Sequence, residues 1–133
     1  MTRRVVLLDS EVLVVRGDFE RILIHEVFHF AWRRLGNPSR RSWELVLLAE
    51  FAAKVPGELG WSAEWRKAKL TLRDAKLRTP VWRRYSRESF CDTAAWRYAQ
   101  LRRHAEFTLA APYRRLRGTW FDATFPRTLE IPI

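Results

Sequence analysis

The chain has 133 residues, the usual length of one domain, and we expect a single domain over residues 1–133. Hydrophobic residues make up 47% of it and there are seven tryptophans, which excludes an intrinsically disordered chain. The net charge of +10 would suit binding to nucleic acid or an acidic partner, but the arginines are spread through the whole chain, which favours an ordinary solvated surface. The single cysteine, Cys91, excludes an internal disulfide.

The N-terminal segment and the cysteine usage indicate a cytoplasmic protein. Asp9 and Glu11 interrupt the apolar runs near the N-terminus, so this segment lacks the apolar region of a signal peptide. No run approaches the ~18 apolar residues of a membrane span, so we expect no membrane association. A single cysteine is typical of a protein in a reducing compartment.

The first predicted elements are two short strands. Residues 4–9 and 11–16 are rich in β-branched and apolar side chains and are separated by a polar turn, which predicts a β-hairpin. Gly17 and Asp18 then end the second strand, and Asp18 can cap the helix that follows.

Helices make up most of the remaining chain. The first predicted helix covers residues 19–35, where apolar residues recur at helical spacing before a Gly-Asn-Pro stop. Three more are predicted at residues 42–55, 62–78 and 86–107, each opened by a serine. Residues 118–133 are strand-like but contain two prolines, which predicts an extended edge segment. The predicted fold class is therefore α+β: mainly helical, with a small N-terminal hairpin or sheet.

The first predicted helix carries the motif His25-Glu26-x-x-His29. Residues four apart in a helix lie roughly 40° apart around the axis and about 6 Å along it, so both imidazoles can reach one metal ion. Zinc binds imidazole nitrogen readily, and Glu26 is close enough to a zinc-bound water to act as its general base. The alternative is a pair of core histidines that satisfy each other or a backbone carbonyl. That alternative is weaker, because burying an unpartnered polar triad is costly.

A catalytic zinc site needs a third protein ligand and an open position for water. Glu88 and Asp92 are four residues apart in the last predicted helix and therefore share one face. Glu88 is the predicted third ligand, with Asp92 orienting a ligand histidine through its other ring nitrogen. Glu50 is an alternative ligand, because the second predicted helix could fold back antiparallel over the first.

The two motifs, His25-Glu26-x-x-His29 and Glu88-x-x-x-Asp92, resemble those of the gluzincin clan of zinc metallopeptidases, the thermolysin-like group. The resemblance implies a minimal zincin-like domain whose active-site helix carries the histidines, with Glu88 as the third zinc ligand. It covers the two motifs and the order of elements rather than the whole chain. The spacer between His29 and Glu88 is longer than in thermolysin-like members.

Zincins often add a tyrosine or histidine that stabilises the oxyanion of the reaction. Tyr85, just before the helix that carries Glu88, is the predicted candidate, although a half-buried surface tyrosine is the simpler interpretation. His104 would lie about 24 Å from Glu88 along a continuous helix, which is too far. Cys91 could supply a thiolate, but a lone cysteine in a helix is more often part of the core.

The leading functional prediction is a small zinc-dependent hydrolase, a peptidase that acts on a peptide or protein substrate. One alternative is a basic nucleic-acid-binding domain with structural zinc or none. Residues 60–69 and 81–87 interleave aromatic and cationic residues, which suits base stacking but favours cation–π packing at the surface. Another alternative is a zincin-like scaffold without proteolytic activity, because the chain has no obvious substrate-binding subdomain.

Overall fold

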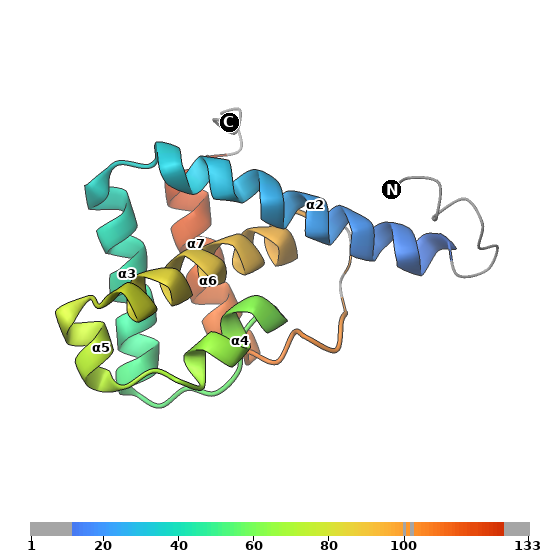
Figure 1. Ribbon diagram of the computed structural model, residues 1–133. Helices are drawn as coiled ribbons and strands as arrows, with labels where there is room; N and C mark the ends of the chain where they lie inside the picture. The colour runs from blue at the N-terminus through green and yellow to red at the C-terminus, as the bar shows by residue number, and fades with distance from the viewer. Residues whose placement is uncertain (1–11, 100, 102, 127–133) are drawn as a thin grey trace.

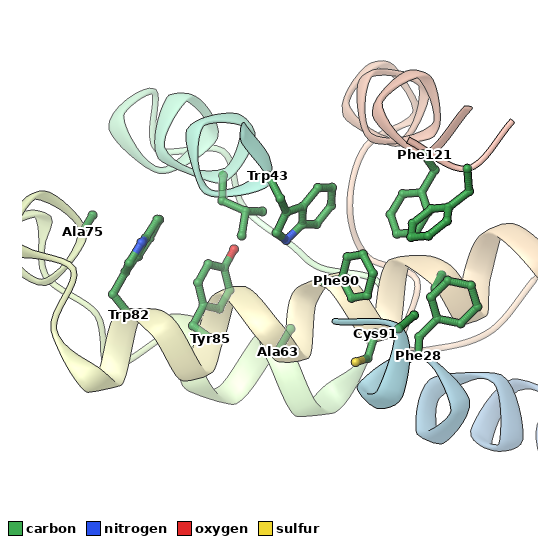
Figure 2. Packing of buried hydrophobic residues seen from close by; sticks show 13 residues of the cluster. Phe28, Trp43, Ala63, Ala75, Trp82, Tyr85, Phe90, Cys91 and Phe121 are labelled. Carbon is green, nitrogen blue, oxygen red and sulfur yellow. The ribbon is translucent and has the colours of Figure 1, made fainter. Parts of the chain in front are cut away.

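The computed structural model describes residues 12–99, 101 and 103–126, and it is helical throughout its regular structure (Figure 1). The helices, in chain order, are α2 (Val12–Arg34), α3 (Asn37–Ala52), α4 (Trp61–Lys67), α5 (Leu72–Leu77), α6 (Pro80–Tyr98) and α7 (Ala111–Thr124). Helix α6 packs against each of the other five. In the close-up, α3 and α7 cover one side of α6, while α2 and α4 cover the other (Figure 2).

Local sequence signals fix the start of α6. Thr79 precedes the helix in extended conformation, and its side chain accepts a hydrogen bond from the backbone N–H of Trp82. Pro80 is the first helical residue, a position where its missing N–H costs nothing. Just upstream, Thr71 and Asp74 form a reciprocal capping box on α5, and Arg78 ends that helix in a left-handed conformation, with φ of 49°. These signals fix the residue at which α6 begins, and therefore where Glu88 and Asp92 lie along the helix.

An aromatic core fills the space between α6 and the helices α2, α3 and α7 (Figure 2). Phe90 of α6 lies at its centre, with its ring stacked on Phe121 at a centroid distance of 5.3 Å. Trp43 contacts both rings edge-on, and Phe28 of α2 approaches Phe90 at 5.8 Å. Burial of rings this large supplies much of the favourable free energy of folding and fixes α2 beside α6.

A buried ionic network lies in the same interior. Arg117 of α7 is fully buried and donates two hydrogen bonds to Glu50, at 2.7 and 3.0 Å, and two to Glu58, both at 2.9 Å. Lys67 lies 3.7 Å from Glu58, and the hydroxyl of Tyr85 donates to the same carboxylate. These five residues are called the Arg117 cluster below. Burial alone would raise the pKa of Glu58, but the Arg117 guanidinium outweighs burial and holds that pKa below its ordinary value.

The predicted α+β fold class is wrong, because no strand occurs in the described part of the chain. The first predicted strand, residues 4–9, lies outside the described residues. Most of the second, from residue 12 onward, is the first turns of α2, which continues through Gly17 and Asp18. A single glycine inside a helix costs only about 1 kcal/mol, and Asp18 pairs with Arg21 one turn later at 3.1 Å instead of capping a new helix. None of the described helices is both long and apolar enough to cross a membrane.

Other predicted boundaries were also wrong: the helices expected at residues 42–55 and 86–107 are α3 (Asn37–Ala52) and α6 (Pro80–Tyr98). The helix expected at residues 62–78 is divided into α4 and α5, because Thr71 starts a new capped helix. The extended segment expected from residue 118 is helical as far as Thr124, because Pro112 starts a helix whose apolar face, with Phe121, reaches the core. Residues 127–133 of that segment lie outside the described part.

Replacing Arg117 by methionine is expected to destabilise the protein by about 3–5 kcal/mol, because Glu50 and Glu58 would stay buried without their main cation. Urea denaturation followed by circular dichroism measures the change. Arg115→Met, on the exposed side of the same helix, is the matched control and should change stability by less than about 0.5 kcal/mol. Equal, small effects of the two substitutions would show that the cluster is not needed for stability.

Candidate metal centre

The two sequence motifs meet where α2 runs beside α6. Helix α2 contributes His25 and His29, and α6 contributes Glu88 and Asp92. All four side chains are at least partly buried at this interface. They are called the His25–Glu88 site below.

Three side chains of the site have ligand atoms at the separation that a single metal ion requires. His25 Nε2 lies 3.3 Å from His29 Nε2 and 3.2 Å from Glu88 Oε1, and His29 Nε2 lies 3.5 Å from Glu88 Oε2. In a tetrahedral zinc site with bonds of about 2.0–2.1 Å, neighbouring ligand atoms are roughly 3.3 Å apart. The two nitrogens and the carboxylate therefore form a triangle of the correct size, and their chemistry suits zinc.

Asp92 holds His25 in the orientation that this triangle needs. Its Oδ1 lies 2.7 Å from His25 Nδ1, so Nδ1–H donates to the carboxylate and Nε2 is turned toward His29 and Glu88. The other carboxylate oxygen accepts a hydrogen bond from the backbone N–H of Ala63 at 3.0 Å. A carboxylate behind a ligand histidine fixes its tautomer and raises its basicity.

Glu88 is held in an equivalent way by its neighbours. Ser62 of α4 donates its hydroxyl to Glu88 Oε1, and Arg87 Nε lies 3.4 Å from Oε2. Burial raises the pKa of Glu88, but hydrogen bonds from His25 and Ser62, together with the nearby histidines, outweigh it and lower the pKa to about 2. Glu88 is thus ionised, as a metal ligand must be.

The two histidines differ in their titration. Burial lowers the pKa of His25, but the hydrogen bonds and charges of Asp92 and Glu88 outweigh it and raise the pKa to about 9. For His29, burial dominates and lowers the pKa below its ordinary value. At neutral pH without metal, His25 is therefore protonated and pairs with the two carboxylates, while His29 is neutral.

Cys91 is also close to the histidines. Its sulfur and one ring nitrogen of each histidine all lie within 4.8 Å of one another, so Cys91 is a further possible ligand. Its side chain is fully buried in the core, and burial, with the neighbouring carboxylates, raises the pKa of the thiol. Because a metal binds the thiolate, the ionised Glu88 is the better third ligand.

Three other residues considered from the sequence are engaged elsewhere. Tyr85 is in the Arg117 cluster, and its ring leaves α6 on a different side from the Cys91 sulfur (Figure 2). Glu50 accepts from Arg117 with both oxygens, so the structure does not bring it to the histidines. His104 pairs with Asp18 at 3.2 Å, in the segment before α7.

Sequence reasoning did not anticipate the part of the site that comes from α4 and the loop before it. Ser62 was expected only as a helix cap, and Gly60 had no predicted role. In the structure Gly60 lies directly against Asp92, so that a Cβ built on Gly60 would overlap the carboxylate. No spacing in the sequence reveals these contacts, because they depend on how α4 docks on α6.

Comparison with models of protein families, with curated proteins and with solved structures found no match. The interpretation of the site therefore depends on its own geometry.

The stability of the metal-free protein should fall as the pH rises from 6.5 to 9. His25 has a pKa of about 9 in the folded chain against an ordinary value of 6.5, so its ion pairs stabilise the fold fully below pH 6.5 and are lost through pH 9. The expected loss is on the order of 2–3 kcal/mol, measured by urea denaturation in the presence of a chelator. His25→Gln should remove the slope, and His104→Gln, which deletes a histidine outside the site, should keep it. If the pH dependence of stability persists in His25→Gln, it arises from groups other than His25.

Gly60→Ala should weaken zinc binding about 10–100-fold, because the new methyl group would push Asp92 away from His25. Competition with a chromogenic chelator measures the affinity. Gly36→Ala is the matched control, since a Cβ there would meet only Pro38 Cδ at an ordinary 3.6 Å. Unchanged affinity in Gly60→Ala would mean that the position of Asp92 does not matter for the metal.

Proposed function

We propose that the protein is a zinc-dependent hydrolase of gluzincin type, acting as a peptidase. The observation that carries the proposal is the triangle of His25 Nε2, His29 Nε2 and the Glu88 carboxylate, with sides of 3.2–3.5 Å, backed by Asp92 on His25. Structural zinc sites are usually closed by four protein ligands, whereas catalytic sites have three and an open position. Three well-placed ligands and one buried, neutral thiol favour the catalytic type.

The residues around the triangle suit hydrolysis of a peptide bond. Zinc, when bound, supplies a Lewis acid that lowers the pKa of a coordinated water. Glu26 follows His25 on α2, is exposed, and has no hydrogen-bond or ion-pair partner among the described residues, so it is free to accept the proton of the attacking water. Glu26 then returns that proton to the leaving amine. Tyr85 has no part in this scheme, because its hydroxyl is bound to Glu58.

Access from solvent also supports a catalytic role. The His29 side chain is 25% exposed, whereas those of Glu88 and His25 are 7% and 14% exposed, so the site is open on the His29 side. Glu26 is exposed as well. A peptide chain can therefore approach the general base and the open side of the triangle together. The unpaired, buried Cys91 supports the further proposal that the protein works in a reducing, cytoplasmic compartment.

A nucleic-acid-binding domain is the second candidate function. The observation that favours it is the exposed mixture of aromatic and cationic side chains on α4, where Trp61 and Trp65 are 66% and 47% exposed. Binding of that kind would weaken steeply with salt and would be indifferent to Glu26→Gln.

Elemental analysis of the purified protein should find close to one zinc per chain in the wild type and almost none in His29→Ala or Glu88→Ala. Cys91→Ala and Glu26→Gln should keep the metal, because neither residue belongs to the triangle. Glu26→Gln should nevertheless lower hydrolysis of a fluorescently labelled unfolded protein by about 10²–10⁴-fold, the usual contribution of a general base.

Two results would contradict the proposal. If the wild type binds no zinc after zinc is supplied, the protein is not a zinc-dependent hydrolase. Zinc lost in Cys91→Ala but kept in Glu88→Ala would replace the proposed ligand set by His25, His29 and Cys91.

A further inference from the structure

A small basic pocket lies at the junction of α4 and α6. It has a volume of about 320 Å³ and is lined by Trp65, Arg66, Lys69, Val81 and Arg84. This volume is at the small end of the range for ligand pockets and suits a side chain rather than a large ligand. No carboxylate lines the pocket, and three of its five residues are cationic.

The pocket is joined to the His25–Glu88 site by direct contacts. Arg66 donates to the Ser62 hydroxyl at 3.1 Å, and Ser62 donates to Glu88. Arg84 precedes Glu88 by four residues on α6, so the two project from nearly the same face about 6 Å apart along the axis. An extended peptide covers that distance in about two residues, at roughly 3.3 Å per residue. A substrate at the triangle would therefore bring a neighbouring side chain to the pocket.

The cations of the pocket are available to a ligand. Within the described part of the chain, neither Lys69 nor Arg84 forms an ion pair with a carboxylate. Arg66 and Lys69 lie over the Trp65 ring at 4.4 and 4.7 Å from its centroid, which fixes their charges beside the pocket. Val81 and Trp65 offer an apolar wall for the methylene groups of an acidic side chain.

The same contacts favour a peptide over a nucleic acid. The two cations occupy the Trp65 ring, so a base would have to displace them in order to stack. A single small pocket also differs from the continuous basic groove that follows a phosphate backbone.

We propose that this pocket is a substrate subsite that binds a glutamate or aspartate side chain of the peptide, close to the bond cleaved at the His25–Glu88 site. The inference rests on the proposed peptidase function and names the class of its substrate. Arg84 and Lys69 pair with the substrate carboxylate, while Arg66 links the pocket to Ser62 and Glu88.

The test measures peptide binding by fluorescence anisotropy, in a Glu26→Gln background that prevents turnover. The probes are a labelled peptide of alternating glutamate and alanine, its counterpart with glutamine in place of glutamate, and a thymidine oligonucleotide of equal length. Salt is kept near 0.15 M, so that the long-range attraction due to the overall charge is screened over about 8 Å. The variants are Lys69→Glu/Arg84→Glu and the matched control Arg73→Glu/Lys76→Glu, which makes the same charge change on the exposed surface of α5.

The expected result is that the glutamate peptide binds about tenfold or more tightly than the glutamine peptide, as two charge-assisted contacts would produce. This preference should disappear in Lys69→Glu/Arg84→Glu and persist in Arg73→Glu/Lys76→Glu. The inference is overturned if Arg73→Glu/Lys76→Glu loses the preference to the same extent, or if the glutamine peptide binds as tightly as the glutamate peptide. It is also overturned if the oligonucleotide binds more tightly than either peptide and Lys69→Glu/Arg84→Glu weakens the binding of the oligonucleotide.

Zinc content of the same preparations reports on the proposed function separately, because neither Lys69 nor Arg84 touches a ligand of the triangle. Zinc bound by every preparation, with no preference for glutamate, would reject the subsite and leave the hydrolase. A preference for glutamate in a protein that binds no zinc would reject the hydrolase.

Discussion

Helix α6 places two carboxylates, Glu88 and Asp92, in the interior, and both need partners from other helices. Asp92 is satisfied by His25 of α2 and by the backbone of α4, and Glu88 by the histidines and Ser62. A buried carboxylate without such partners would cost several kcal/mol, so α2 and α4 can dock on α6 only in the register that supplies them. The geometry of the metal centre is thus a consequence of how three helices satisfy buried charge.

In the Arg117 cluster, too, buried charged groups are paired across neighbouring elements that pack against α6. Ser89 donates to Glu58, and Thr93 accepts from Arg117, so α7 and the loop before α4 are attached to α6 by hydrogen bonds as well as by aromatic packing. Glu58 and Gly60 are two residues apart, and they serve the two buried clusters respectively. The loop that contains them therefore lies against both clusters.

The residues of the His25–Glu88 site could be predicted from the sequence, but most of the contacts around them could not. His25 with His29, and Glu88 with Asp92, could be paired in advance because four-residue spacing in a helix places side chains on one face whatever the tertiary structure. Tyr85 was expected to precede a helix that begins at Ser86, whereas Thr79 and Pro80 start α6 earlier, and Tyr85 is a buried residue within it. The second predicted strand is helical from residue 12 onward, because β-branched residues have only a weak, context-dependent preference for sheets. Contacts such as Arg117 with Glu50, 67 residues apart, have no local signature.

Protonation of His25 supplies a positive charge to the site while no metal is bound. In that state the imidazolium charge lies between Glu88 and Asp92, at 3.2 and 2.7 Å, where a cation is needed to offset two carboxylates. The three groups together carry a net charge of −1 while His25 is protonated, and the proposed zinc, replacing that proton, would bring the sum of the three groups and the ion to zero. The ion pairs of the metal-free chain thus already hold these side chains together, and the proposed zinc would bind to groups that are in place.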